Sequence, residues 1–444
     1  MSTLTERFAE LVHGLRYDQV PEVVREKAKA LVAHGLAVGL VSYDLEPARI
    51  ARHVLTATEP LESGARILVD GNRVTVGGAV FANSTLMHAR NADDAYHTAP
   101  HIGCAVIPVA LAVAETTGAS GRAVLEAIIA GYEVSAYCIG DFVGPSTRKG
   151  FRASSIYDTF GAAATAGRLL GLSQSQIADA LGIAASGSAG LLQGLGESRL
   201  DWKFQPGQAA RAGYFAAVLA QAGVTGARQA LEGPQGFYRA FCGLEEVPDF
   251  LAELGRRWEI LEVTSKLFPV AMYNQTPLRT VLRLRREHDL TPDQIERVDV
   301  EMADFEVNYP GAKFKGPFEP GVPPPSSIPY VIATGFAHGA GTLAAQLATD
   351  HPATLALLDR IEVRGSATRQ QSTCRIVVRT RSGQELVGEA PEGPPYYQLT
   401  WDRAVNAIRE LQAESPLSLE PLAQAVSGLE TARDVGAVLR ACTR

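Results

Sequence analysis

The chain has 444 residues, more than one hydrophobic core usually organises, so we expect two domains. Its apolar content of 46% and charged content of 20% are typical of a soluble globular protein. The net charge of −7, with Lys and Arg scattered along the chain, predicts no nucleic-acid or membrane partner but leaves room for a small anionic ligand in a local cationic pocket.

The five cysteines lie far apart and form no CxxC pair, so we predict reduced thiols and neither a cluster, a zinc site nor a disulfide framework. The first twenty residues lack the apolar core of a signal peptide. The apolar run at 30–44 is interrupted by His34 and by glycines, and it is too short to span a bilayer. We therefore expect a cytoplasmic protein.

The pattern from the N-terminus to about residue 265 is helical, with alanine-rich segments separated by glycine. Pro21 lies near the start of the first such run, and Ser173 and Ser175 precede Gln176 as helix caps. Small residues let helices approach closely, which favours a core of many buried helices. The runs that predict helices are 20–40, 103–118, 120–140, 154–172, 173–192 and 207–223.

After residue 266 the pattern becomes mixed. It predicts a helix at 276–290, a strand at 294–305, a helix at 327–339, a short strand at 359–366 and a hairpin over 372–390 that turns at Ser382 and Gly383. A connector rich in proline and glycine then leads back to helical runs at 401–414 and 419–442. The fold class that follows is mainly α: an all-helical domain (1–266 and 396–444) with a smaller α+β domain (267–395) inserted in it.

Residues 87–105 concentrate proton chemistry, because they hold three histidines and two adjacent aspartates. Asp93, His97 and His101 are spaced by four, as metal ligands on one helix face would be. Pro100 breaks such a helix, so we predict no metal site.

A structural interpretation of the same residues is also open. It makes His88 and His97 buried hydrogen-bonding residues, and it makes Asp93 and Asp94 parts of a cap or a polar network. His101 differs from them because it follows a proline and stands directly before a predicted helix, whose N-terminus favours anions.

Two glycine-rich stretches, 144–150 and 187–197, follow no predicted strand and do not match a phosphate loop, so we predict no nucleotide cofactor. Lys203 and Lys266 lie in short apolar or aromatic contexts at the edges of predicted helices. Either alone is most simply a solvated surface lysine. Together, two cations would hold a di- or tricarboxylate while a histidine moves a proton.

Residues 81–115 resemble the segment of the MmgE/PrpD family that usually runs His-Ala-Leu-Asp-Phe-Asp-Asp-Thr, then His-Pro-Ser or His-Pro-Gly, then an apolar helix. Further matches follow in order and cover nearly all of the chain. The family includes 2-methylcitrate dehydratase, cis-aconitate decarboxylase and iminodisuccinate epimerase. The resemblance therefore implies cofactor-free chemistry on polycarboxylates, in a homodimer whose active site lies between a helical domain and an α+β lid domain.

The resemblance also implies roles for single residues. His101 falls on the family's catalytic histidine, Lys203 and Lys266 on its two active-site lysines, and Tyr330 on its lid tyrosine. Asp93 would orient the network around them.

Four further residues are expected to contact the substrate: Asn91, His97, Arg152 and Tyr273. Asn91 would hydrogen-bond either the substrate or His101 without titrating.

The chain departs from the family pattern at four positions. Asn91 stands where the family usually has aspartate, and Ala95 where it has threonine. Gln205 stands where histidine is common, and Ala271 where decarboxylase-like members carry histidine. The missing first carboxylate removes a candidate acid or base, which weakens the case for strict citrate-type dehydration and for cis-aconitate decarboxylation alike.

Removing a proton next to a carboxylate adds negative charge to a group that is already anionic, and preorganised cations are the expected remedy. The leading hypothesis is a cofactor-independent hydro-lyase, a dehydratase that acts on a 2-methylcitrate-like di- or tricarboxylate. An epimerase, isomerase or decarboxylase of a related polycarboxylate is the alternative. A catalytically silent carboxylate-binding relative is the alternative of another class.

Overall fold

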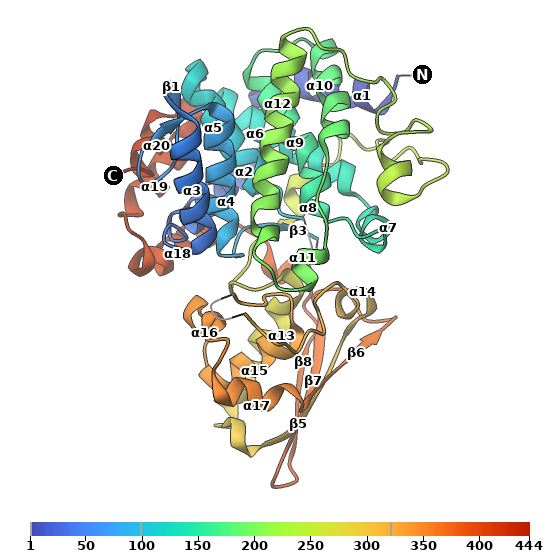
Figure 1. Cartoon of the computed structure of the whole chain (residues 1–444), viewed down its shortest axis with the longest axis vertical. Coiled ribbons are helices and arrows are strands. Elements are labelled where there is room, and N and C mark those ends of the chain that lie inside the picture. Colours follow the sequence, from blue (N-terminus) through green and yellow to red (C-terminus); the bar gives the residue numbers. More distant parts are fainter. Residues whose placement is uncertain (1, 98–99, 320–321) are drawn as a thin grey trace.

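The computed structural model describes residues 2–97, 100–319 and 322–444. It is mainly helical with one small mixed sheet, as the sequence predicts (Figure 1). Helices fill the upper part of the view, and the sheet with its covering helices forms the lower part. We call residues 267–395 the lid region and the rest the helical region; these domain boundaries stay a prediction.

The predicted helices of the helical region are present. They are α2 (Glu22–Leu40), α5 (Gly103–Thr117), α6 (Gly121–Ile139), α9 (Asp158–Leu169), α10 (Gln174–Gly187) and α12 (Gln205–Gln221). Ser173 caps α10, because its hydroxyl accepts from the Gln176 backbone N–H at 3.3 Å while the Gln176 side chain accepts from the Ser173 N–H. Ser175 lies inside α10, so the second cap that we expected is wrong.

Three more helices, α1 (Leu4–Gly14), α3 (Glu46–Thr58) and α4 (Val76–Ala89), were not predicted. Helix α4 is buried from Gly77 to Ala89 except at Phe81, so its sequence has no polar face to mark a helical period. It packs against α3, α5 and α12 and leads directly into the segment of histidines and aspartates.

The lid region contains a four-stranded sheet in the order β6-β5-β7-β8. Its strands are β5 (Ile295–Ala303), β6 (Ile361–Ser366), β7 (Cys374–Thr380) and β8 (Glu385–Ala390). β5 runs parallel to β6 and antiparallel to β7, and β7–β8 is the predicted hairpin. Helices α13 (Gln275–Glu287), α15 (Ile328–His338) and α17 (Pro352–Leu358) cover the sheet.

The C-terminal helices α18 (Trp401–Leu411), α19 (Glu420–Ser427) and α20 (Gly436–Ala441) return to the helical region, where α18 and α19 pack against α2. The run at 419–442 is therefore two short helices rather than one, interrupted between Gly428 and Gly436.

The chain crosses between the two regions near residue 264 and again near residue 398, and these two segments lie side by side. β3 (Ala95–Tyr96) pairs antiparallel with β4 (Val263–Thr264), and Thr264 also forms a bridge with Gln398. The buried Lys27 ammonium of α2 joins both segments, because it donates to Val263 O at 2.5 Å and to Leu399 O at 3.2 Å. This pairing brings residue 266 beside the loop that follows α4.

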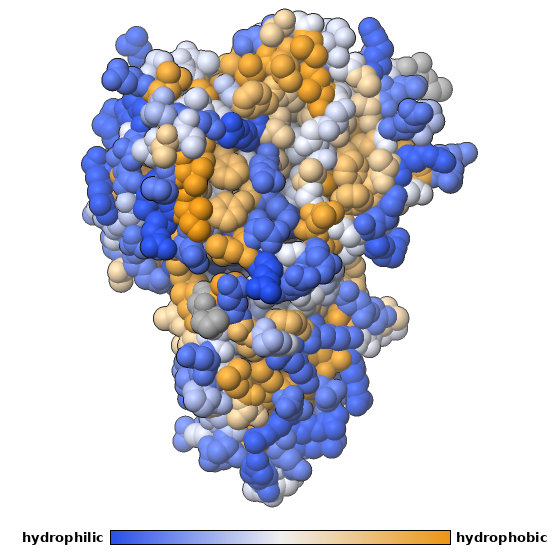
Figure 2. Space-filling view, viewed as in Figure 1, coloured by the Kyte–Doolittle hydropathy of each residue, from blue (hydrophilic) through white to orange (hydrophobic). Residues whose placement is uncertain are grey.

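Each region has its own apolar core, but Leu192, Leu195 and Trp202 of the helical region pack into the core of the lid region. Figure 2 shows exposed hydrophobic side chains on the face formed by α3 and α12, where Ile50, Val54, Phe215 and Leu219 are 37–47% exposed. Such patches are typical of contact surfaces, and the homodimer stays a prediction. Within the described residues, no helix is both long and apolar enough to cross a membrane.

Candidate functional site

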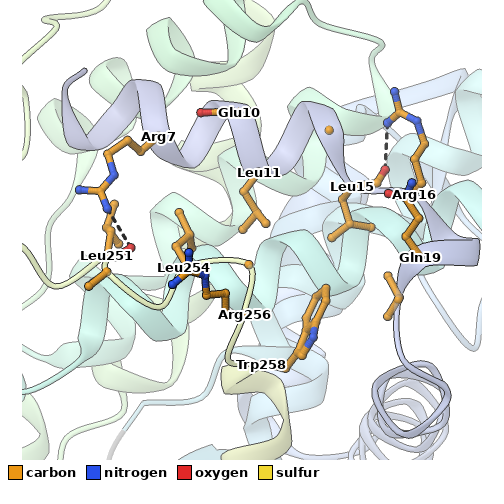
Figure 3. A pocket seen from close by; sticks show the side chains of 14 residues that line it. Arg7, Glu10, Leu11, Leu15, Arg16, Gln19, Leu251, Leu254, Arg256 and Trp258 are labelled. Carbon is orange, nitrogen blue, oxygen red and sulfur yellow. Dashed lines mark hydrogen bonds between the residues drawn. The ribbon is translucent and has the colours of Figure 1, made fainter. Parts of the chain in front are cut away.

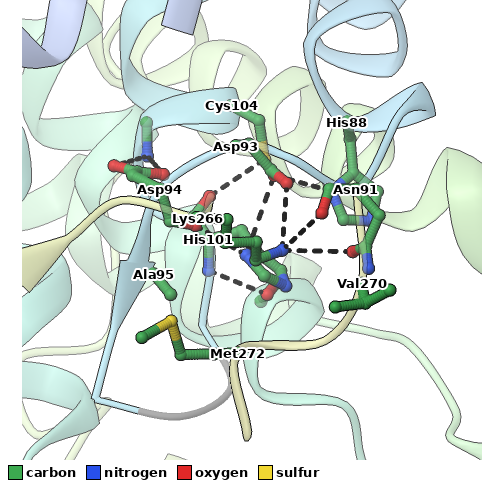
Figure 4. Close-up of polar contacts among 12 residues, drawn as sticks. His88, Asn91, Asp93, Asp94, Ala95, His101, Cys104, Lys266, Val270 and Met272 are labelled. Atoms are coloured by element: carbon green, nitrogen blue, oxygen red, sulfur yellow. Dashed lines mark hydrogen bonds and ion pairs between the residues drawn. The ribbon is translucent and has the colours of Figure 1, made fainter. Parts of the chain in front are cut away.

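Five polar side chains converge from the end of α4, from the loop between α4 and α5, and from the segment that follows β4 (Figure 4). They are His88, Asn91, Asp93, His101 and Lys266, and each is at most 8% exposed. His88 lies in the last turn of α4, and Asn91, Asp93 and His101 follow it before α5 begins, whereas residue 266 arrives through the β3–β4 pair. The structure thus assembles four of the residues that the sequence singled out, Asn91, Asp93, His101 and Lys266, into one buried cluster.

Asp93 lies at the centre of this cluster. One carboxylate oxygen accepts from His88 Nδ1 at 2.7 Å and lies 3.7 Å from His101 Nδ1, and the other lies 3.4 Å from Lys266 Nζ. Burial alone would raise the pKa of Asp93, but the two imidazoles and the ammonium stabilise the carboxylate more strongly and hold that pKa well below its ordinary value. Asp93 is therefore a fixed negative charge.

Arg152 determines the proton position on His88. Its Nη2 lies 2.9 Å from His88 Nε2, and a guanidinium can only donate, so Nε2 accepts and Nδ1 carries the hydrogen that points at Asp93. Burial lowers the pKa of His88 to about 3, which keeps the ring neutral. Arg152 also donates to Trp202 O at 2.6 Å, so the structure places it behind His88 as a support.

His101 carries its hydrogen on the same ring nitrogen as His88, but its Nε2 has no partner among the described residues. Its Nδ1 lies 2.8 Å from the carbonyl oxygen of Asp94, which can only accept, so Nδ1 carries the hydrogen and Nε2 presents a lone pair. No described residue hydrogen-bonds to Nε2. Burial, reinforced by the positive charge of Lys266, lowers the pKa of His101 well below its ordinary value. With its pKa so lowered, the ring is a neutral base.

Both lysines are buried. Lys266 Nζ donates to Asn91 through its backbone oxygen at 3.0 Å and its side-chain oxygen at 3.2 Å. Lys203 Nζ donates to Ala89 O at 2.9 Å and lies 4.1 Å from the centre of the Trp202 ring. Burial lowers the pKa of both amines, so a bound anion would stabilise their charged forms.

Asn91 has a positive φ of 58°, a conformation that asparagine tolerates better than most residues. Both of its oxygens face Lys266, so its observed partner is Lys266 and not His101, contrary to one of the two expectations. Asp93 is the only described carboxylate within 4.0 Å of Lys266. Because Asn91 is neutral, the lysine keeps more uncompensated charge than an aspartate there would leave it.

Three predicted site residues lie elsewhere in this structure. The Tyr330 hydroxyl donates to Gln346 O at 2.8 Å, and the Tyr273 hydroxyl to Ser326 O at 2.9 Å, both in the interior of the lid region. His97 is exposed and its ring lies tilted against that of Tyr96, so the expectation that it is buried is wrong, whereas His88 is fully buried as expected.

Asp94 has two sets of hydrogen-bond partners, and the sequence indicated only one of them. It accepts from Gly103 N at 3.2 Å and therefore caps α5, in line with a cap or network role. It also accepts from the Tyr132 hydroxyl of α6 at 2.6 Å, a partner that no local pattern could reveal. Burial raises the pKa of Asp94 to about 7.

One group in the cluster has metal-ligating atoms, since His88, Asp93 and Cys104 each offer one within 4.8 Å of the others. The surroundings do not fit a cation. Burial raises the pKa of the Cys104 thiol, which donates to His101 O at 2.9 Å, and Arg152 and Lys266 already supply positive charge.

Two cavities border the cluster. One of about 60 Å³ is lined by Asn91, Trp202 and Lys203, and one of about 450 Å³ is lined by His34 and Lys266. A further cavity lies between α1 and residues 251–258, and none of the predicted site residues lines it (Figure 3).

The fold and the site define a protein with a buried histidine, carboxylate and lysine cluster where a helical region meets a sheet-containing one. Residues 6–248 match the model of the MmgE/PrpD N-terminal domain, and the chain belongs to the MmgE/PrpD family.

Named relatives are similar over much of the chain. Cis-aconitate decarboxylases of Mus musculus and Homo sapiens are each 27% identical over 70% of this chain, and the matched segment spans 66% of their length, just under two thirds. The cis-aconitate decarboxylase-like protein oryM of Aspergillus oryzae is 26% identical over 98% of this chain and 96% of its own length.

Proposed function

We propose that this protein is a cofactor-independent lyase that decarboxylates a small di- or tricarboxylate, with cis-aconitate or a close analogue as the first candidate. The observation that carries the proposal is the buried His101 ring, whose Nδ1 hydrogen is committed to Asp94 O while Nε2 has no partner among the described residues. Family membership and the names of the relatives favour decarboxylation over the dehydration that was our leading hypothesis.

The chemistry would run as follows. The carbon–carbon bond to one carboxylate breaks, CO2 leaves, and the electron pair moves into the remaining unsaturated polycarboxylate. Lys203 and Lys266 would stabilise the developing negative charge in a site closed from water. His101 Nε2 would then deliver a proton to carbon.

A polyanion bound beside His101 favours the charged imidazolium. Substrate binding itself would therefore raise the pKa of His101, and the ring would take up a proton. This step is needed because burial, with the charge of Lys266, lowers the pKa of His101 and keeps the ring neutral. The neutral ring supports dehydration as a second candidate, in which Nε2 removes a proton next to a carboxylate and a hydroxyl group leaves.

The departures from the family pattern support a close analogue as substrate. Ala95 lies with Met272 and Tyr397 in a small apolar cluster, at a position where the family usually offers a threonine hydroxyl. Ala271 likewise offers no polar atom beyond its backbone. Fewer polar contacts at these positions would suit a substrate with fewer polar groups than cis-aconitate or citrate.

The test is turnover of cis-aconitate, citrate and 2-methylcitrate in deuterated water, followed by CO2 release and proton NMR. We expect CO2 and one deuterium incorporated per product, and a loss of at least about 100-fold in His101→Ala. His53→Ala, on the exposed surface of α3, is the matched control. Unchanged turnover in His101→Ala would overturn the proposal, and loss of water without CO2 would favour the dehydratase.

A further inference from the structure

An apolar cavity of about 60 Å³ lies between the helical region and the lid region. Of the described residues that line it, all but four are apolar. Leu200 and Trp202 line it from the helical region, and Val322 and the two leucines of helix α16 (Leu343–Leu347) line it from the lid region. Ligand sites are often found at such junctions, with apolar walls and a few polar groups.

The polar residues of this lining determine which part of a ligand the cavity can hold. Arg90 is committed to a bidentate ion pair with a glutamate at 2.6 and 2.9 Å, and both oxygens of Asn91 accept from Lys266. Glu46 is itself a carboxylate and would repel an anion. The cavity therefore disfavours a carboxylate and favours an uncharged group.

Lys203 is the fourth polar residue of the lining, and it connects the cavity to the candidate site. Its Nζ donates to Ala89 O at 2.9 Å, and an ammonium has three hydrogens, so hydrogens remain for a ligand. In the proposed function this ammonium holds a substrate carboxylate. The ring of Trp202 has its centre 4.1 Å from Nζ, so apolar surface lies directly beside such a carboxylate.

The volume of the cavity limits the size of the group that it accepts. A water-sized group needs about 10–15 Å³ of such volume, so the cavity of about 60 Å³ has room for about four of them. A space with apolar walls is unfavourable for water and favourable for hydrocarbon. A chain of about four carbons would fill it.

We propose that this cavity receives an uncharged alkyl substituent of the substrate, about four carbons long, while Lys203 holds the adjacent carboxylate. The inference rests on the proposed function and narrows its substrate class to polycarboxylates that carry such a substituent. Leu343 and Leu347 line the cavity from α16 and set the length of the chain that fits.

The test measures how the binding of saturated, unreactive succinates depends on the length of an alkyl chain attached to them. Calorimetry with the full chain gives the Kd for succinate, methylsuccinate, butylsuccinate and octylsuccinate. We expect the affinity to rise about fourfold per methylene up to butyl, because each buried methylene leaves water. From butyl to octyl we expect no further rise, because the cavity is full.

Two substitutions change the cavity volume in opposite directions. Leu347→Phe should weaken the binding of butylsuccinate about tenfold and change that of methylsuccinate less than about twofold, because only the longer chain reaches the filled space. Leu343→Ala should let the affinity rise further from butyl to octyl. The control is Leu355→Phe, which adds the same ring on α17 at a residue that is 41% exposed and outside the lining.

The outcomes separate this inference from the proposed function. An affinity that does not depend on chain length, or that rises equally in the wild type and Leu347→Phe, overturns the alkyl site and leaves the proposed lyase standing. An affinity that rises as expected, without release of CO2 or water from any substrate, supports the alkyl site and overturns the lyase. If Leu347→Phe does not fold, the octylsuccinate affinity of Leu343→Ala decides, and a value equal to that of the wild type overturns the alkyl site.

Discussion

His88 donates its Nδ1 hydrogen to Asp93 across 2.7 Å while its other nitrogen accepts from Arg152 at 2.9 Å. These two hydrogen bonds fix the orientation of the Asp93 carboxylate, which lies between Lys266 and His101. A substitution of Arg152 should therefore first change the protonation of His88.

Arg152→Gln should raise the pKa of His88, because the positive charge of Arg152 contributes to lowering it. Titration of the His88 ring by NMR would show protonation beginning at higher pH than in the wild type, where the pKa is about 3. Arg148→Gln, at the exposed end of helix α7 (Val143–Arg148), is the charge-matched control. An unchanged His88 titration would show that Arg152 does not set its protonation.

Asn91 should matter both as an acceptor for Lys266 and as a residue with positive φ. Asn91→Gly removes the acceptor but tolerates the backbone, so we expect a loss of about 1–3 kcal/mol in the free energy of unfolding. Asn91→Ala should cost about 1 kcal/mol more, because alanine is strained at positive φ. Urea denaturation measures both, and equal losses would contradict the backbone contribution.

Lys27 should stabilise the junction between the regions. Lys27→Met leaves the buried oxygens of Val263 and Leu399 without their donor, so we expect a loss of about 2–4 kcal/mol in the free energy of unfolding. The control is Lys315→Met, whose side chain is 35% exposed and whose ion pair with Glu362 spans 3.9 Å. If both variants unfold at the same urea concentration, the junction role is wrong.

Stability should fall as pH rises from about 6.5 to 8. Burial raises the pKa of Glu133 and Glu306 to about 8, above the value of about 4.3 for an unfolded glutamate. The native state then binds more protons than the unfolded state in this range, so stability decreases with pH, by about 1.4 kcal/mol per pH unit for each group.

Below about pH 6.5 the buried histidines act in the opposite direction, because the pKa of His34 is lowered to about 4 and that of His88 to about 3. In this pH range a histidine of the unfolded chain binds a proton, whereas the buried rings of the native state do not. The free energy of unfolding therefore decreases in acid. Urea denaturation between pH 5 and 8 measures the profile, and Glu133→Gln should flatten its alkaline limb. A profile that rises from pH 6.5 to 8 would refute this assignment.

Elements with a clear hydrophobic period and residues with distinctive chemistry were predictable from the amino-acid order alone. α13, with polar and apolar faces, and the alternating strand β5 were predictable, and so was the cap at Ser173. α4 was not, because a helix buried on all sides has no polar period to read.

How these residues meet depends on contacts between distant parts of the folded chain. The pairing of Ala95 with Thr264 joins positions 169 residues apart, and no local pattern encodes such a contact. The partners of the two histidines, Arg152 and Asp94 O, fix which ring nitrogen carries the hydrogen. The spacing of residues along the chain indicates which groups are candidates for a site. Packing sets the orientation of these groups, their protonation and the cavity beside them, because burial and neighbouring charge exist only in the folded chain.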